Sequence, residues 1–354
     1  MEGEKERNSS IELLRIVMMI VIIAHHYVVH SGVEELFDYG NPNSKMIFLK
    51  CFGLFGKMAI NCFVLITGFF ICQKKLKIKK VLQLYLEVKF YQIIMYIIMV
   101  AAGFTNFNVK GLLITVVSVL RSGNEGFVSA FLALYILIPF INILINNIKE
   151  KDHLFIIVFF IILYTVPRSF LHGGTYSYMG WYFNVYLIGA YIKKYPKEWM
   201  KKTWLNAVVS LISWGSIVLI TALSIKKGST LFYWLICESC DLFSIVIGLF
   251  IFLLFNNLKI PHSRVINVLA KTTFGILLIH IANDGIRDLL WNKIFAVSYS
   301  YQVLSLYSLV LHSILSVIIV FIVCAIIDML RIYLIEKPLF RLINRHYSVK
   351  HVAN

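Results

Sequence analysis

The sequence predicts an all-α integral membrane protein with about ten transmembrane helices. Three observations carry this prediction: apolar runs recur along the whole chain of 354 residues, 59% of the residues are hydrophobic and only 15% are charged, and the mean hydropathy is +0.80. A soluble chain of this composition lacks the polar side chains needed to cover its surface. A helix that crosses the hydrocarbon needs about 20 mostly apolar residues, and such runs follow one another here.

The expected transmembrane helices, in chain order, lie near residues 11–30, 47–72, 84–103, 127–147, 153–171, 180–195, 204–225, 231–256, 264–283 and 303–335. Acidic residues lie among the basic ones ahead of the first run and no small-residue cleavage site follows Tyr27, so we expect a retained helix rather than a signal peptide. The shorter stretch 108–120 is expected to be interfacial or re-entrant. Because no internal repeat and no separate soluble segment interrupts the runs, residues 1–354 are expected to form one membrane domain.

The basic residues set the expected orientation. A formal net charge of +16 also fits nucleic-acid binding, so the distribution of the charges has to decide. With the N-terminus inside, 24 of the 34 Lys and Arg residues fall on inner segments, namely 1–15, 74–89, 149–151, 193–202, 259–271 and 331–354. The positive-inside rule then predicts cytoplasmic N- and C-termini, and nucleic-acid binding is not expected. The lysine-rich loop 73–80 could also attract anionic lipid or a phosphorylated ligand.

Two of the six cysteines have a spacing that is typical of redox and zinc sites. Cys237 and Cys240 form a C-x-x-C pattern, but they lie inside an apolar run with neither a second cysteine pair nor a neighbouring histidine. We interpret them as small packing residues. Neither a metal site nor a disulfide framework is expected.

Three expected helices carry a histidine in the outer half of the membrane. The first helix runs outward, so His25 and His26 lie about 20 Å along its axis. His280 lies near the outer end of the ninth helix and His312 in the first third of the tenth. Ionisable groups within a membrane are costly and frequently functional, although a single histidine can simply bond to a neighbouring helix. The shared depth favours a functional role for His26 and His280 and gives His312 only weak support.

The inner end of the first helix carries a charged pair. Glu12 and Arg15 are three residues apart and can pair on one helix face. Arg15 can either snorkel to the interface or hold an anionic ligand that enters from the cytoplasm. The second interpretation gives this helix a cation at its inner end and a proton acceptor at its outer end, which suits transfer of a group across the membrane.

Four short patterns follow one another in the chain: Leu14-Arg15 followed eleven positions later by His26, residues 61–69 with Thr67, residues 273–280 with Leu277, and residues 333–338 with their Glu-Lys-Pro ending. In this order they resemble the patterns of the integral-membrane acyltransferase family 3, which has a serine in place of Thr67 and a tyrosine in place of Leu277. Members of this family O-acylate, usually O-acetylate, sugars of surface polysaccharides. Each pattern is weak alone, but all four in order on ten expected helices are specific.

The resemblance implies acyl transfer from acetyl-CoA to a sugar hydroxyl. Histidine suits the base that such a poor nucleophile needs, and the sequence leaves two routes open: the histidine deprotonates the sugar, or it is itself acylated first. The family spacing selects His26 over His25, which lies about 100° away around the helix axis. Arg15, Glu12 and His280 are the further expected site residues, and Lys77, Lys79 and Lys80 are expected to hold the anionic nucleotide of the donor.

The resemblance also indicates a branch of the family. Residues 127–135 with Pro139-Phe140, and residues 189–192 after Trp181, are similar to low-GC Gram-positive members that act on capsular or exopolysaccharide. The plasma membrane is therefore the expected location. The chain departs from the family twice. Many members have Arg-x-x-Arg after the second helix, where this chain has Lys80 in the nearest frame, and lysine lacks the bidentate fork of arginine. Some branches have a carboxylate before the fourth helix, where this chain has Ser129 and Ala130.

Two other classes of function remain open to the sequence. A transporter or flippase would also have ten helices with intramembrane charges, and Glu238, Asp241 and Asp328 could form its path. The chain lacks the paired Gly/Pro-broken helices that are typical of inverted-repeat transporters, and transport does not explain the four ordered patterns. A purely structural partner in polysaccharide assembly would make His26 dispensable.

Overall fold

The computed structural model describes residues 7–76, 78–117, 126–174 and 176–341, which form helices and loops without a β-strand. The predicted all-α fold is confirmed for this part of the chain. The α-helices are α1 (Ser9–Val29), α2 (Ser44–Phe52), α3 (Gly56–Ile71), α4 (Ile78–Ala101), α5 (Val109–Val117), α6 (Phe127–Asn147), α7 (Glu150–Phe160), α8 (Val166–Leu171), α9 (Tyr178–Lys194), α10 (Thr203–Lys226), α11 (Leu231–Ile236), α12 (Leu242–Asn257), α13 (Arg264–Leu269), α14 (Thr273–His280), α15 (Asp284–Asp288), α16 (Val297–Val303) and α17 (Leu306–Arg331). Shorter 3₁₀ or π turns are η1 (Val33–Leu36), η2 (Ile161–Thr165), η3 (Glu198–Lys201), η4 (Ala270–Thr272), η5 (Leu289–Ile294) and η6 (Ile332–Glu336).

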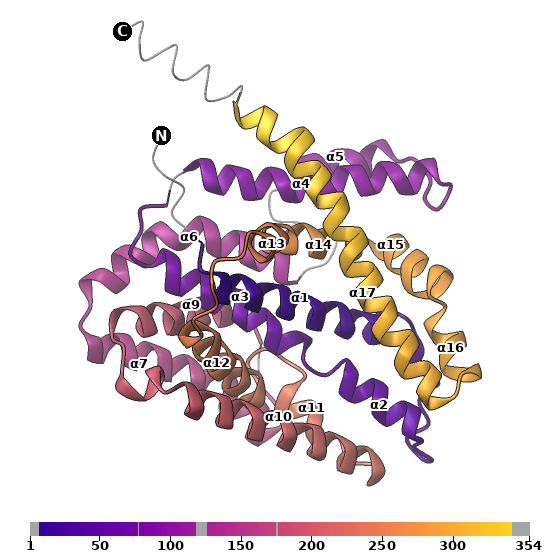
Figure 1. The fold of residues 1–354 in the computed structure, drawn as a ribbon, viewed down its shortest axis with the longest axis horizontal. Coiled ribbons are helices and arrows are strands. Elements are labelled where there is room, and N and C mark those ends of the chain that lie inside the picture. The colour runs from indigo at the N-terminus through magenta and orange to yellow at the C-terminus, as the bar shows by residue number, and fades with distance from the viewer. Residues whose placement is uncertain (1–6, 77, 118–125, 175, 342–354) are drawn as a thin grey trace, which may run out of the picture.

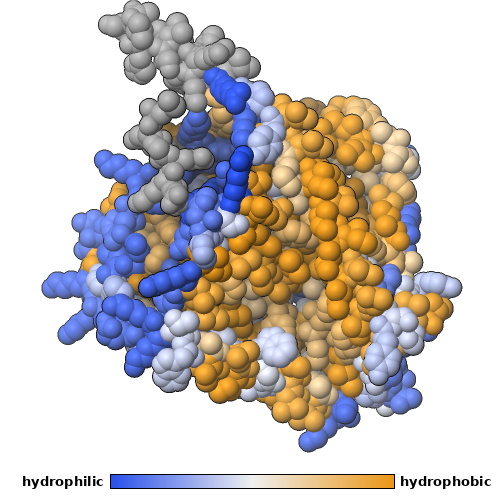
Figure 2. Space-filling model, viewed as in Figure 1, coloured by the Kyte–Doolittle hydropathy of each residue, from blue (hydrophilic) through white to orange (hydrophobic). Residues whose placement is uncertain are grey.

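The surface of the bundle is that of a protein embedded in lipid. Most long helices run across Figure 1 in broadly the same direction. Figure 2 shows a broad apolar belt over the middle of this face, with hydrophilic residues gathered mainly at one side and smaller groups at the opposite edge. Large apolar side chains such as Phe155, Leu211 and Leu311 are exposed on α7, α10 and α17. Helices suit this setting because they satisfy their own backbone hydrogen bonds in hydrocarbon.

Helices occupy all ten predicted ranges, but fewer are long enough to count as spans. Among the described residues, seven helices are long and apolar enough to cross a membrane, or eight if the bent pair 264–280 and 284–303 is one span. The prediction of ten is therefore not confirmed. Helix α9 has only 17 residues and packs against α3, α6 and α7 inside the bundle. The stretch 108–120, predicted as interfacial or re-entrant, contains α5, which packs against α4. Residues 118–120 of this stretch lie outside the described part of the chain.

The predicted helix 231–256 is broken because an aspartate interrupts it. The carboxylate of Asp241 accepts hydrogen bonds from Arg168 Nε at 2.8 Å and from the Glu238 backbone N–H at 2.7 Å. Asp241 is fully buried, so these bonds hold the turn between α11 and α12. A long-range ion pair thus overrides the apolar pattern of this segment.

Helix α1 lies at the centre of the bundle and packs against α3, α12, α14 and α17. The Asn8 side chain caps its first turn by accepting from the Ser10 N–H at 3.0 Å. Ser9 Oγ donates to Asn267 Oδ1 at 3.2 Å, and Ser10 Oγ donates to the Leu258 carbonyl at 2.7 Å. These bonds fix the start of the helix that carries His25 and His26.

Several segments that are predicted to lie on the inner side of the membrane contact one another, although they are far apart in the sequence. Lys197 Nζ lies 2.5 Å from Glu150 Oε1, and Gln83 Nε2 donates to Glu336 Oε1 at 2.5 Å. We call the end of the bundle that holds residues 7–15, 74–89, 149–151, 193–202, 259–271 and 331–341 the lysine-rich end, and the opposite end the histidine end. Which of them faces the cytoplasm stays a prediction.

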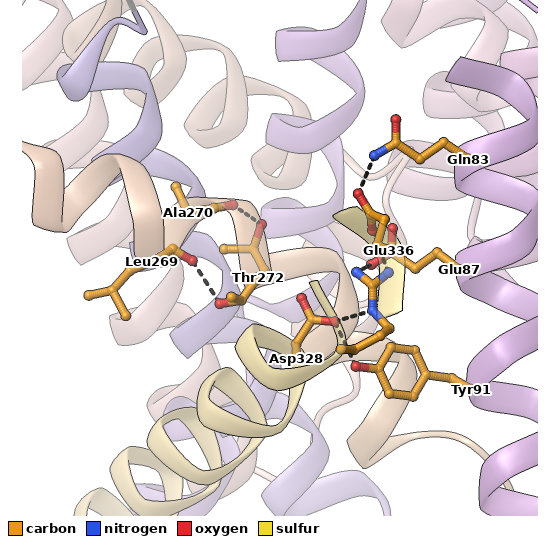
Figure 3. A network of polar contacts seen from close by, with 10 residues as sticks. Gln83, Glu87, Tyr91, Leu269, Ala270, Thr272, Asp328 and Glu336 are labelled. Atoms are coloured by element: carbon orange, nitrogen blue, oxygen red, sulfur yellow. Dashed lines mark hydrogen bonds and ion pairs between the residues drawn. The ribbon is translucent and has the colours of Figure 1, made fainter. Parts of the chain in front are cut away.

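A charged network at the lysine-rich end joins α4 to the C-terminal part of α17 (Figure 3). Arg331 binds three carboxylates: Asp328 Oδ1 at 2.7 Å, Glu336 Oε2 at 2.5 Å and Glu87 Oε1 at 2.8 Å. Tyr91 donates a further hydrogen bond to Asp328 Oδ1 at 2.6 Å. Buried charges of this kind are tolerated only when they are paired. The Glu336 of the fourth sequence pattern therefore has a structural partner in Arg331.

Glycines allow α3 and α9 to approach closely. A Cβ on Gly68 would lie 2.3 Å from the Tyr186 carbonyl oxygen, and a Cβ on Gly189 would lie 2.5 Å from the Leu65 carbonyl oxygen. Both contacts are with backbone, which cannot rotate away. Small residues at helix contacts allow such packing within membranes.

We therefore expect Gly68→Ala and Gly189→Ala each to destabilise the fold by about 1–3 kcal/mol, because the added methyl group forces the two backbones apart. Thermal unfolding of the purified protein in detergent micelles measures the effect. Gly215→Ala is the matched control, since nothing lies within 4 Å of its Cβ position on α10. Equal melting temperatures for Gly68→Ala and Gly215→Ala would contradict this account of the α3–α9 contact.

Candidate active site

Two histidines from different helices are joined by a hydrogen bond at the histidine end. His26 lies in the last turn of α1, and its Nδ1 is 2.8 Å from Nε2 of His280, the last residue of α14. The other ring nitrogen of His280, Nδ1, is 2.6 Å from the carbonyl oxygen of Ile276. His280 is 1% exposed, whereas His26 is only half-buried. The chain Ile276–His280–His26 thus leads from the protein interior to an accessible ring.

The hydrogen bonds determine which nitrogen of His26 is free. A carbonyl oxygen only accepts, so His280 Nδ1 donates to Ile276. In the neutral ring, Nε2 of His280 is then an acceptor, and Nδ1 of His26 must donate to it. Nε2 of His26 consequently keeps its lone pair and can accept a proton from a ligand. Fixing the tautomer through the second ring nitrogen is a recurrent way to orient a base.

His25 and His312 have other partners. His25 Nδ1 donates to the Gly53 carbonyl at 2.6 Å, and its ring lies against Gly56, where a Cβ would come within 2.3 Å. The Tyr27 hydroxyl lies 2.8 Å from His312 Nδ1. Of the three predicted histidine-bearing helices, two therefore contribute to one pair, and the third supplies a histidine that bonds to Tyr27.

A cavity of about 790 Å³, which we call the histidine cavity, adjoins this pair. Its lining combines aromatic rings with charged side chains: His25, His26, His30, Tyr39, Tyr178, Tyr233, Trp234, Glu34, Lys50, Lys57 and Arg287. Lys50 pairs with Glu34 at 2.5 Å and Lys57 with Glu238 at 3.6 Å. The cavity therefore presents flat apolar faces beside hydrogen-bonding groups.

A second cavity, of about 1020 Å³, opens toward the lysine-rich end, and we call it the lysine cavity. Five cationic side chains contribute to its lining: Arg7, Arg15, Lys74, Lys80 and Lys193. Two carboxylates, Glu12 and Glu87, also lie there, and Glu87 is bound to Arg331. The excess of cations suits an anionic ligand.

The predicted pair of Glu12 and Arg15 lies on this cavity. Arg15 Nε is 3.8 Å from Glu12 Oε2, and Arg7 Nη1 is 3.4 Å from Glu12 Oε1. Arg15 Nε is buried and has no hydrogen-bond partner in the described part of the chain. An unpartnered buried donor is costly, so this guanidinium has capacity left for a ligand.

The three lysines predicted to hold the nucleotide of the donor differ in their position relative to the lysine cavity. Lys80 lines the lysine cavity. Lys79 lies over the Phe340 ring, 5.1 Å from its centroid, and is not among the lining residues. Lys77 lies outside the described residues.

The acidic residues considered for a transport path are held in separate ion pairs. Asp241 binds Arg168 and Asp328 binds Arg331, while Glu238 lies 3.6 Å from Lys57. Asp328 belongs to the lysine-rich end, and Glu238 belongs to the histidine end. The three carboxylates are therefore components of local hydrogen-bond and ion-pair networks, and they do not line up along a single transport path.

Sequence reasoning missed His30, Lys57 and Lys193. His30 follows His26 by one helical turn, and the two rings lie 4.8 Å apart, so the i,i+4 spacing alone could have found it. Lys57 lies in the first turn of α3, inside a predicted apolar run, and Lys193 lies at the end of α9. Nothing local in the sequence indicates that these lysines line the two cavities.

Comparison with known proteins adds one finding. A family model described as an acyltransferase domain matches residues 8–329. No curated protein and no solved structure gives a significant match. The predicted family is confirmed by this match, while the low-GC Gram-positive branch stays a prediction.

The two cavities are expected to open on opposite sides of the membrane, which thiol labelling can test. In a variant with Cys51 and Cys237 changed to Ser, the remaining cysteines are buried. Added to this background, Tyr39→Cys should react with a membrane-impermeant maleimide in intact cells. Lys80→Cys should react only after the membrane is permeabilised. Labelling of Lys80→Cys in intact cells would contradict the predicted orientation.

Proposed function

The chain belongs to acyltransferase family 3 and is a membrane acyltransferase, and from this premise we propose that it transfers an acetyl group from cytoplasmic acetyl-CoA to a hydroxyl of a cell-surface polysaccharide. One observation carries the proposal: a cationic cavity at one end of α1 and a histidine-lined cavity at the other approach each other inside the bundle. A donor and an acceptor on opposite sides of a membrane require such an arrangement.

The charges of the lysine cavity support acetyl-CoA as the donor. The nucleotide part of CoA carries phosphates, and five cationic side chains line this cavity. Arg15 offers a planar guanidinium, the group that pairs with phosphate through two parallel hydrogen bonds. Lys80 and its neighbouring lysines act as point charges. They can supply the positive charge of the family's missing Arg-x-x-Arg, but they cannot form its bidentate hydrogen bonds.

The lining of the histidine cavity supports a sugar as the acceptor. A sugar has apolar C–H faces and many hydroxyls, and the cavity offers aromatic rings beside charged hydrogen-bonding groups. Tyr178 accepts a hydrogen bond from Lys57 Nζ at 2.5 Å, and Glu34 is bound by Lys50. Preformed polar groups among apolar walls are typical of small-molecule sites.

The proposed reaction follows from the free nitrogen of His26. Nε2 removes the proton from the acceptor hydroxyl as the hydroxyl oxygen bonds to the thioester carbonyl carbon. The C–S bond then breaks, and CoA leaves as a thiolate that takes up the proton from Nε2 of His26, which returns the ring to its neutral form. His280 acts as a positioning residue because it holds His26 in the required tautomer. General base catalysis of this kind contributes about 10²–10⁴-fold to a rate.

The setting of the reaction follows from the same orientation. If the lysine-rich end is cytoplasmic, acetyl-CoA reaches its cavity directly, and the histidine cavity faces the cell surface. We propose the plasma membrane as the location and capsular or exopolysaccharide of a low-GC Gram-positive cell as the acceptor. The resemblance of residues 127–140 and 189–192 to such members supports this assignment.

His26→Ala is expected to lower the rate of acetyl transfer by about 10²–10⁴-fold, because the base is lost. His25→Ala is the matched control, since the adjacent ring binds the Gly53 carbonyl and is not joined to His280. O-acetyl groups on the surface polysaccharide of the host cell, quantified at equal membrane levels of each variant, give the readout. Wild-type acetylation in His26→Ala cells would overturn the catalytic role.

Lys80→Ala is expected to raise the KM for acetyl-CoA by up to about fivefold while kcat stays unchanged. A solvated ion pair contributes about 1 kcal/mol or less, and four other cationic side chains remain in the lining. Lys79→Ala removes the neighbouring charge, which lies over Phe340, and should have the smaller effect. Steady-state kinetics on purified enzyme measure both variants. Equal KM values for Lys80→Ala and wild type would remove Lys80 from the donor site.

A further inference from the structure

Three apolar side chains separate the two cavities. Ile22 of α1, Phe127 of α6 and Leu277 of α14 line both of them. Ile22 is 2% exposed and Leu277 is 3% exposed, and the Phe127 ring stacks on Phe131 at 5.3 Å. Among the described residues, no polar side chain is common to the two linings. The boundary between the cationic and the histidine-lined cavity is therefore apolar.

This boundary lies directly before the histidine pair. Ile22 precedes His26 by four residues on α1, and Leu277 precedes His280 by three residues on α14. Residues at these spacings lie on one face of a helix. Along α1, Arg15 and His26 are separated by eleven residues, or about 16 Å, and Ile22 lies between them. A ligand that extends from the lysine cavity to His26 must pass these three side chains.

We propose that Ile22, Phe127 and Leu277 form a collar that sets the largest acyl group the enzyme transfers. The inference rests on the proposed function, because only a donor that enters the lysine cavity has to place its acyl group between these three side chains for the thioester carbonyl to reach His26. The side chains come from three helices. Helices α1 and α14 pack against each other, and Phe131 of α6, which stacks on Phe127, lies 6.2 Å from the Phe274 ring of α14.

The collar discriminates between acyl groups by their volume. Well-packed apolar side chains resist the insertion of extra methylene groups because neighbouring rotamers and backbone must shift. Each methylene that an apolar site must accommodate changes the relative rate by about 10–200-fold. An acetyl group carries a single methyl beyond the carbonyl, whereas a butyryl group carries two further methylenes. The collar therefore favours acetyl transfer over butyryl transfer.

The experiment compares two donors in the full-length enzyme reconstituted in phospholipid vesicles. Transfer of radiolabelled acetyl and butyryl groups from CoA to alkali-deacetylated surface polysaccharide of the source cell gives kcat/KM for each donor. We expect Ile22→Ala and Leu277→Ala to raise the butyryl-to-acetyl ratio at least about tenfold. Ile23→Ala is the matched control, because Ile23 is also fully buried on α1 but lines neither cavity. Its ratio should equal that of the wild type.

The outcomes separate the collar from the proposed function. If wild-type enzyme transfers acetyl groups but the ratio is unchanged in both Ile22→Ala and Leu277→Ala, the collar is overturned and the donor assignment stands. If wild-type enzyme uses neither CoA thioester, the donor assignment and the collar fall together. If the alanine variants do not fold, Ile22→Val removes one methyl group and should raise the ratio in the same direction; an unchanged ratio would also overturn the proposal.

Discussion

The site depends on one hydrogen bond between two intramembrane rings. An unpaired polar group in hydrocarbon is costly, and Nδ1 of His280 is paired with the carbonyl of its own helix at Ile276. This leaves a single acceptor for the Nδ1–H of His26, so the tautomer of His26 follows from the backbone of α14. The contact also fixes the approach of α1 to α14, and therefore the Ile22–Leu277 boundary, which lies about one turn before the two histidines on both helices.

The same helix links two sites of opposite character. Helix α1 carries Arg15 at the lysine cavity and His26 at the histidine cavity. Arg15 is therefore suited to hold an anion, and His26 is suited to accept a proton. Arg331 supports the first of these sites indirectly, since it ties α17 to Glu87 on α4, a residue of the cavity wall. Buried ion pairs contribute little net stability, so the value of this network lies in fixing the position of α4.

The positions of most helices and the shared depth of His26 and His280 could be predicted from the sequence, since both follow from local features. That the two rings meet could not, because 254 residues separate them in the chain. Apolar runs mark helices, and the residue count along each helix gives the depth of His26 and His280. Contacts between residues that are far apart in the sequence could not be predicted. Arg168, which holds the break at Asp241, is 73 residues away in the chain, and the partner of His312 is Tyr27 on another helix. Lys193 and Lys57 reach the cavities only through the packing of α9 and α3.

The state of His26 itself is the most direct test of this account. Solid-state nitrogen NMR of the protein in bilayers, with ring-labelled histidine and a His26→Ala difference spectrum, reports which ring nitrogen carries the proton. We expect a neutral ring with the proton on Nδ1 and a free Nε2, and loss of this preference when His280 is changed to Phe. A proton on Nε2 of His26 in the unaltered protein would contradict its assignment as the base.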